Sequence, residues 1–338
     1  MPLKLLARGG ELEKPRSSRD ELAQRIERLL PKDGALEPAP GLILSRLSSQ
    51  AGPIYGVGEP SFCIIAQGSK VVVLGKERYR YDPSTYLLIS AGVPLTGHVV
   101  EASGKRPYLG VRVVLDRALI TSVLIEADQL VSRSGGTVRA LAVSRLDEDL
   151  LDAMLRLVRL VDSPTLFGML APLVVREIVY RLSLGEQCGR LRQMATGGGQ
   201  VQRIAKGIEL LRKDFDQPLR IPGLARQLGL SVSGFHHQFK AVTAMSPLQF
   251  QKQLRMQEAR RLLLSGAFDA TTAGYRVGYE EPSHFSREYR KFFGEPPMRD
   301  VERLQRVAAK EEGKGKREVL RSTHGLIGTD LTRSRTGR

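Results

Sequence analysis

The sequence predicts a two-domain α+β protein. Its N-terminal half is expected to be an antiparallel β barrel with flanking helices, and its C-terminal half an all-α domain with two helix-turn-helix units. Three observations in the 338-residue chain predict this class. Short β-rich runs fill residues 42–115, a helix-turn-helix pattern occurs twice after residue 220, and a glycine-rich segment at 196–200 separates the two regions.

The chain begins with a predicted helix and continues with predicted strands. Residues 19–30 place Leu22, Ile26 and Leu29 at helical spacing, and Pro31 ends the pattern. Turn sequences then separate short apolar runs, which predict a small antiparallel barrel or sandwich. The predicted strands are 42–47, 62–66, 71–74, 79–81, 86–89, 99–100 and 109–115. Helical periodicity returns at Asp116, and residues 147–183 predict two helices interrupted at 162–164.

Residues that could carry catalysis are scarce in this half. Its only histidine is His98, whereas a metal site needs several converging ligands, so we expect no metal, no cofactor and no catalytic group. Cys63 lies between two apolar residues of a predicted strand, which favours a buried structural thiol. The alternative is an effector-sensing or redox-sensing cysteine, which requires a positive and partly exposed environment. The composition suits a ligand-binding or dimerising module.

The C-terminal half contains an internal repeat. Residues 224–231 form a helix-and-glycine-turn pattern, followed by Phe235 and Phe239, and the same pattern returns at 273–279, followed by Phe285 and Tyr289. Each unit predicts a short helix, a turn and a second helix whose aromatic residues face the core. The exposed side of each second helix is therefore the predicted DNA-binding surface. Its residues are Ser233, His236, His237 and Lys240 in the first unit, and Ser283, His284, Arg287, Arg290 and Lys291 in the second.

One amphipathic helix, residues 247–264, is predicted to connect the two units. At 1.5 Å per residue it spans about 27 Å, which would place two reading heads roughly one DNA turn apart. The adjacent pair His236–His237 could suggest a metal site. Neighbouring residues on a helix diverge by about 100°, however, so a role in the DNA groove or in solvent is favoured.

The net charge of +16 is concentrated in the C-terminal half. Residues 1–199 carry 26 basic and 21 acidic side chains, whereas residues 200–338 carry 26 and 15. Such a surplus predicts an anionic polymer as partner, and two helix-turn-helix units specify double-stranded DNA. We expect residues 301–338 to be a disordered basic tail that adds non-specific affinity or is merely solvated.

Composition also excludes several classes of protein. No apolar run reaches the length of a membrane helix, the N-terminus lacks the long apolar stretch of a secretion signal, and two cysteines cannot build a disulfide framework. We therefore expect a cytoplasmic protein that does not bind membranes.

The predicted DNA-binding region resembles a known family. Residues 204–300, through the segments 244–263 and 277–297, are similar to the DNA-binding domain of the AraC/XylS family of bacterial transcription regulators. The segments 59–70, 81–87 and 106–109 resemble the N-terminal domain of one branch of that family. Ala244 and Gly274 depart from the family pattern, which usually has Gly and Ala, and Gly274 predicts a less rigid second unit.

The resemblance implies a cupin-like effector and dimerisation domain over 15–195, a linker at 196–200 and a DNA-binding domain over 201–300. It further implies a small-molecule or redox effector, a homodimer, and RNA polymerase as a protein partner in activation or repression. Two other hypotheses remain: an enzyme localised by its basic half, and an architectural DNA-binding protein with no effector. The missing catalytic cluster argues against the enzyme.

Overall fold

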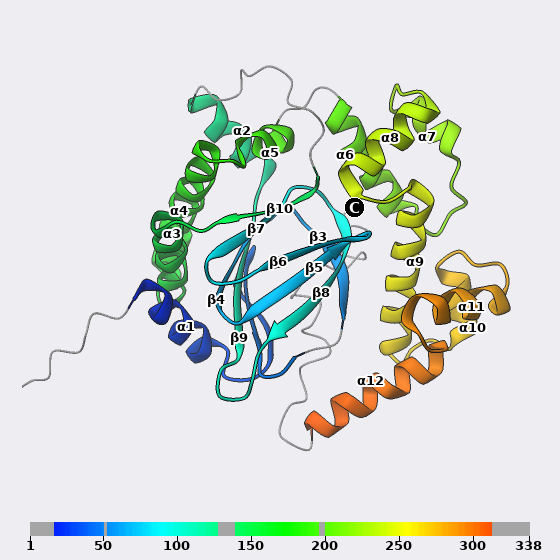
Figure 1. Cartoon of the computed structure of the whole chain (residues 1–338), viewed down its shortest axis with the longest axis horizontal. Coiled ribbons are helices and arrows are strands. Elements are labelled where there is room, and N and C mark those ends of the chain that lie inside the picture. The colour runs from blue at the N-terminus through cyan, green and yellow to red at the C-terminus, as the bar shows by residue number, and fades with distance from the viewer. Residues whose placement is uncertain (1–16, 51–52, 128–138, 196–199, 313–338) are drawn as a thin grey trace, which may run out of the picture.

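The computed structural model describes residues 17–50, 53–127, 139–195 and 200–312 (Figure 1). Its strands are β1 (Gly34–Ala39), β2 (Leu42–Leu47), β3 (Ile54–Gly58), β4 (Ser61–Gln67), β5 (Ser69–Leu74), β6 (Glu77–Tyr81), β7 (Thr85–Ile89), β8 (Val93–Glu101), β9 (Tyr108–Val114) and β10 (Leu141–Arg145). Its helices are α1 (Ser18–Leu29), α2 (Arg117–Glu126), α3 (Glu148–Arg159), η1 (Leu160–Asp162), α4 (Pro164–Leu184), α5 (Cys188–Ala195), α6 (Gln200–Lys213), α7 (Ile221–Gln227), α8 (Val232–Thr243), α9 (Pro247–Leu264), α10 (Ala270–Arg276), α11 (Pro282–Phe293) and α12 (Pro297–Glu312).

The strands form two antiparallel sheets, ordered β1-β2-β9-β4-β7-β10 and β3-β8-β5-β6. Their inner faces share a buried interior, and Cys63 on β4 pairs with Leu87 and Arg112 on the neighbouring strands. The predicted antiparallel β domain is therefore confirmed, with a strand at each predicted position. Three further strands were not predicted. β1 contains Pro38, β3 contains two glycines, and β10 follows a helix within a region of helical periodicity.

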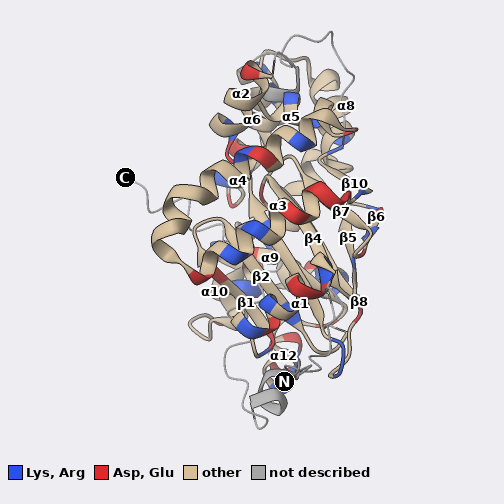
Figure 2. Ribbon diagram, turned by 90° about the vertical axis from the view of Figure 1, so that its left-hand side faces the viewer, with Lys and Arg blue, Asp and Glu red and all other residues tan. Residues whose placement is uncertain are grey.

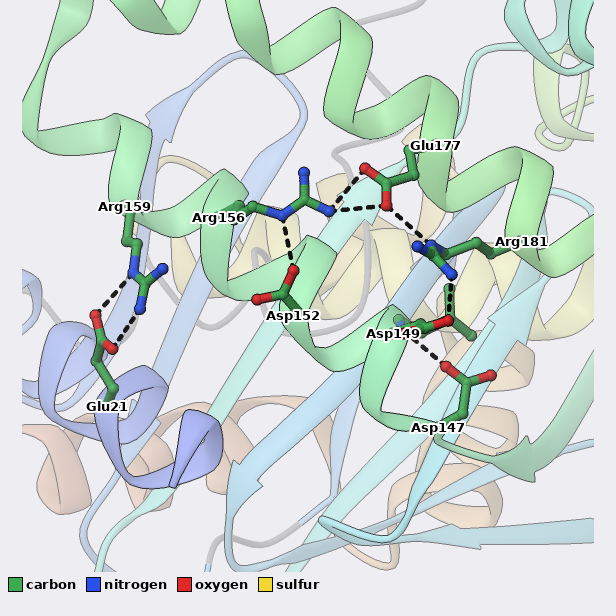
Figure 3. A network of polar contacts seen from close by, with 9 residues as sticks. Glu21, Asp147, Asp149, Asp152, Arg156, Arg159, Glu177 and Arg181 are labelled. Atoms are coloured by element: carbon green, nitrogen blue, oxygen red, sulfur yellow. Dashed lines mark hydrogen bonds and ion pairs between the residues drawn. The ribbon is translucent and has the colours of Figure 1, made fainter. Parts of the chain in front are cut away.

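Helices α1 to α4 cover the outer face of the six-stranded sheet, where their apolar residues form a second core. Ion pairs tie these helices together (Figure 3). Glu21 of α1 pairs with Arg159 of α3, and Arg156 of α3 reaches Glu177 of α4 at 2.7 Å. Acidic and basic segments lie side by side on this layer (Figure 2). We refer to the sheets together with helices α1 to α5 as the β domain.

Helices α6 to α12 form the all-α part, on the other side of the sheets from α3 and α4 (Figure 1). α9 has the predicted bounds and runs between the α7–α8 pair and the α10–α11 pair. One prediction was wrong: α12 continues to Glu312, so residues 301–312 are helical, because Val301 is buried and Asp300 is held by ion pairs. The remainder of the predicted tail and most of the predicted linker lie outside the described residues.

The two halves share one hydrophobic core, which the sequence did not predict. Residues of the sheet interior, such as Leu95, belong to the same buried cluster as residues of the helix-turn-helix units. As a result α9 is not the simple amphipathic helix that was predicted, because it is buried on more than one side. Gln257, Glu258 and Arg260 of α9 are all less than 9% exposed. None of the helices in the described ranges is long and apolar enough to cross a membrane.

Candidate nucleic-acid interface

The first helix-turn-helix unit consists of α7 and α8. Pro222 lies in the first turn of α7, and Ser231 caps α8 by accepting a hydrogen bond from the backbone N–H of Gly234 at 3.1 Å. Phe235 and Phe239 are fully buried and contact one another. This burial fixes which side of α8 faces outward.

The second unit consists of α10 and α11. Asp269 caps α10, and the turn between the helices passes through Gly278 at φ +87°. A Cβ atom at residue 278 would lie 1.9 Å from the backbone oxygen of Asp216, so only glycine fits this turn. Phe285 and Tyr289 are fully buried and orient α11 as the corresponding residues orient α8.

Gly274 lies where the two helices of the second unit meet. It is buried in α10, and a Cβ atom there would lie 3.0–3.3 Å from atoms of Phe285. Glycine at this position therefore allows α10 and α11 to approach closely. The lower rigidity of the second unit stays a prediction.

Every predicted DNA contact is exposed on the outer side of α8 or α11, which we call the reading helices. These exposed residues are Ser233, His236, His237, Lys240, Ser283, His284, Arg287, Arg290 and Lys291. The structure brings them together as two separate groups, one on each reading helix. The His284 ring packs edge-on against Tyr279, with ring centroids 5.4 Å apart, so its position is partly fixed.

Two basic residues of α9 hold the second unit in place. Arg255 donates hydrogen bonds to the backbone oxygens of Phe215 and Gly278, both at 2.8 Å, and thereby ties the segment after α6 to the second turn. Lys252 forms an ion pair with Glu288 of α11. Some of the basic residues whose charge predicted attraction to DNA therefore form hydrogen bonds and ion pairs within the protein instead.

A buried polar cluster joins α9, α11 and α12. Arg260 donates to both carboxylate oxygens of Asp300 at 2.8 and 2.9 Å, and the Tyr289 hydroxyl and Arg303 donate to the same carboxylate. Asp300 is fully buried. Burial and the neighbouring Asp300 carboxylate raise the pKa of Tyr289, so its hydroxyl remains a donor.

The β domain contacts the C-terminal end of both reading helices. Arg139 donates hydrogen bonds to the backbone oxygens of Lys240 and Ala241 in α8, at 2.6 and 2.5 Å. At the other end, the ring of Tyr55 on β3 lies 5.8 and 5.0 Å from the rings of Phe292 and Phe293 in α11. Neither contact was predicted, because each joins residues more than 100 positions apart and no local pattern marks it.

Cys63 faces the interior between the sheets and is 6% exposed. Burial raises the pKa of its thiol, so the reactive thiolate is disfavoured. The same interior holds two basic side chains, Lys70 and Arg112, which are 3% and 7% exposed. Burial lowers the pKa of Lys70 to about 8, and the nearby Arg112 adds to this effect.

Two family comparisons cover most of the chain. Residues 38–190 match the family described as AraC-type transcriptional regulator N-terminus, and residues 224–321 match a helix-turn-helix domain family. The chain is 30% identical over 105 residues to the HTH-type transcriptional activator RhaS of Pectobacterium atrosepticum, which is 31% of this chain and 38% of RhaS. It therefore matches less than half of that relative.

Longer matches occur at lower identity. The virulence regulon transcriptional activator VirF of Yersinia enterocolitica is 23% identical over 268 residues, covering 76% of this chain and 95% of VirF. A solved structure of ToxT from Vibrio cholerae shares the fold, with a TM-score of 0.51 and 12% identity over 77% of this chain and 97% of ToxT.

A β domain joined to two capped helix-turn-helix units, whose reading helices are exposed and carry basic residues, defines a DNA-binding transcription regulator. The matches over both halves are consistent with this class, and the chain belongs to the AraC family of transcription regulators. The prediction that the protein is not an enzyme is thereby confirmed.

Proposed function

We propose that the two reading helices enter successive major grooves on one face of double-stranded DNA and recognise a specific sequence there. The observation that carries this proposal is the arrangement of the two units at opposite ends of α9 (Figure 1). A helix of 18 residues spans about 27 Å, which is close to the separation of roughly 34 Å between successive grooves.

Within this proposal the exposed residues divide into two roles. His236, His237, Ser283, His284 and Arg287 lie nearer the N-terminal ends of the reading helices, where side chains reach base edges or the adjacent phosphates. The long basic residues nearer the C-terminal ends, Lys240, Arg290 and Lys291, are placed to contact phosphates. Ser233 lies in the first turn of α8 and belongs with the first group.

A pair of substitutions tests the assignment. Arg287→Ala is expected to weaken binding to the selected site by about 1–3 kcal/mol and binding to random DNA much less. Lys291→Ala, its matched control on the same helix, is expected to weaken both equally and to reduce the salt slope by about one. Affinities of the full chain for a duplex selected from a randomised library would be measured by fluorescence anisotropy. Equal losses on both DNAs for Arg287→Ala would make that residue a phosphate contact.

We also propose two domains, the β domain within residues 15–195 and a DNA-binding domain from residue 200 to Glu312. The helices that end at Ala195 and begin at Gln200 support a boundary between these residues. Limited proteolysis tests it, because cleavage at 196–199 should leave both fragments intact. Early cleavage within a sheet would contradict the boundary.

A small-molecule effector bound by the β domain is the form of control that we favour over redox sensing. Cys63 is buried and its thiol has a raised pKa, whereas Lys70 and Arg112 offer positive charge within the same interior. These two cations suit an effector that carries a negative charge. A thermal-shift screen of organic anions tests this: stabilisation of the wild type that is lost in Lys70→Met supports it. A response to oxidant that disappears in Cys63→Ser would instead support redox sensing.

We further propose that the protein forms a homodimer through α4. Leu166, Met169, Leu170 and Leu173 are 41–75% exposed and lie at the i, i+3, i+4, i+7 spacing of a helix–helix seam. Another side of α4, which carries the buried residues Ala171 and Val174, packs into the second core against α3. The ion pairs of Figure 3 lie further along α4, at Glu177 and Arg181. The exposed side has no charged residue between Pro164 and Val175, so a second copy of α4 meets no like charge there.

Analytical ultracentrifugation of the full chain tests the dimer. Met169→Glu should convert a dimer into a monomer, because it places like charges across a two-fold seam. Leu248→Glu is a suitable control, since Leu248 is equally apolar and 65% exposed but lies on α9. A dimer that persists in Met169→Glu would refute the α4 seam.

A further inference from the structure

The contacts between the β domain and the reading helices occur at corresponding places in the two units. In the first unit the end of α8 is held by Arg139, and the backbone N–H of Ala140 donates to the Val242 oxygen at 3.0 Å. In the second unit Tyr55 packs on Phe292 and Phe293, the last two residues of α11. In both units the β domain therefore holds the C-terminal end of the reading helix and leaves its DNA-facing side exposed.

A third contact lies between these two. Gln257, near the middle of α9, donates a hydrogen bond to the backbone oxygen of Leu95 on β8 at 3.2 Å. β8 pairs with β3, the strand that carries Tyr55, so two of the three contacts arise from one pair of strands. The sheet thus holds the middle of α9 through Gln257. The two units at the ends of α9 are held through Arg139 and Tyr55.

Tyr55 acts on the second unit without being part of its internal structure. Its ring lies 5.0 Å from the guanidinium carbon of Arg260, and Phe293 lies 4.4 Å from that carbon on the unit's own side. Arg260 is also held by both oxygens of Asp300. Removal of the Tyr55 ring would leave Asp300 and Phe293 in contact with Arg260, so the unit keeps its own polar cluster.

Arg139 has a similar relation to the first unit. Its guanidinium is shared between Glu77 on β6 and the C-terminal oxygens of α8, where the helix dipole favours positive charge. The capped N-terminus and the aromatic core of α8 do not involve Arg139. Both residues therefore link domains, and neither is a core residue of the unit that it touches.

We propose that the β domain, through Tyr55 and Arg139, fixes the spacing and angle of the two reading helices and so determines which separation of half-sites the protein accepts. Tyr55 and Arg139 are positioning residues in this proposal, because they touch the reading helices and not the DNA. The inference rests on the proposed two-groove recognition. It goes beyond that function by assigning spacing selectivity to the β domain.

The test compares spacing preference in the full-length chain. Wild-type protein first selects duplexes from a randomised library, and the selected site is then remade with one base pair inserted between its half-sites. Because an insertion rotates and shifts one half-site, the wild type should lose about tenfold or more in affinity. Tyr55→Ala should lose less than about threefold on the same insertion, since its second unit can adjust.

Controls separate this effect from a general loss of structure. Tyr55→Phe keeps the ring and should behave as the wild type, and binding to a duplex with a single half-site should be unchanged in all variants. Arg139→Gln is an independent variant that should relax spacing from the first unit. Arg80→Ala, which removes an exposed ion pair with Glu101 on the same sheet, should have no effect. Circular dichroism establishes whether each variant is folded. If Tyr55→Ala does not fold, the spacing preference of Arg139→Gln decides the result.

The possible outcomes are distinct. An unchanged penalty for the insertion in both Tyr55→Ala and Arg139→Gln overturns the inference, even though two half-sites are still recognised. Selection of only one half-site by the wild type would instead refute the two-groove function on which the inference rests. A reduced penalty in the two variants, together with a normal penalty in Tyr55→Phe, supports it.

Discussion

Asp300→Ala is expected to destabilise the DNA-binding domain by about 3 kcal/mol or more. The carboxylate is fully buried and accepts hydrogen bonds from Arg260, Tyr289 and Arg303 at 2.6–2.9 Å. Loss of one partner of a buried ion pair costs about 3–5 kcal/mol, because the other charge stays buried without compensation. In the variant Arg260 would keep its cation–π contacts with the rings of Tyr55 and Phe293, and such a contact contributes up to about 2 kcal/mol. We therefore expect a loss of stability near the lower end of the range of about 3–5 kcal/mol.

Scanning calorimetry of the full chain measures this effect. Unfolding entropy is about 2.1 cal/mol/K per residue, so 1 kcal/mol corresponds to about 1.4 °C of Tm in a chain of 338 residues, and the transition should fall by about 4 °C or more. Glu302→Ala is the matched control on α12, because its ion pair with Arg306 is exposed and such pairs contribute less than about 1 kcal/mol. The double variant Arg260→Met/Asp300→Leu should recover much of the loss, since it leaves no buried charge. A fall in Tm no larger for Asp300→Ala than for Glu302→Ala would refute the reasoning.

Three further predictions follow from the structure. The pKa of Lys70 is lowered to about 8, so above that pH the unfolded chain binds more protons than the folded chain. The free energy of unfolding should therefore rise from about pH 8 to about pH 10 in the wild type, and this rise should be absent in Lys70→Met. Glu21 has a pKa lowered from 4.5 to about 2, chiefly by Arg159, so stability should fall as the pH drops through this range, and fall less in Glu21→Gln. Gly294→Ala, at the left-handed C-terminal end of α11, should lower the free energy of unfolding by about 1 kcal/mol. Ala244→Gly, at the equivalent end of α8, should raise it by less than this amount, because the substitution also removes a methyl contact with the core.

Urea unfolding curves check all three. Parallel pH profiles of Lys70→Met and wild type would show that this lysine is not desolvated, and a Glu21→Gln profile identical to the wild type would show that its ion pairs contribute nothing. Destabilisation by both substitutions at the helix ends would contradict the assigned strain at Ala244, which has φ +58°.

Local signals explain what could be predicted from the sequence. The start of α9 follows from Ser246 and Pro247, and the start of α8 follows from the Ser231 cap, because N-capping is decided within four residues. The exposure of His236 and Arg287 follows from helical periodicity around buried aromatic residues.

Long-range contacts explain what could not be predicted. Nothing near Arg260 marks it as the partner of Asp300, 40 residues away, and its charge indicated DNA attraction instead. Tyr55 lies in a short strand with two glycines, a pattern too weak to predict a strand or an interface. The helix of residues 301–312 was assigned to the tail for the same reason, since its anchor at Asp300 depends on tertiary structure.

The burial of α9 against the sheets bears on the exchange of domains between related regulators. A chimera joined within residues 196–199 would place a foreign sheet against Gln257 and Arg260, which are shaped to meet this chain's Leu95 and Tyr55. In such a hybrid, the C-terminal ends of the reading helices would lose their contacts with Arg139 and Tyr55. A functional exchange therefore has to transfer the strand residues that contact α9 together with the DNA-binding half. The segment that must be exchanged is thus larger than the DNA-binding domain.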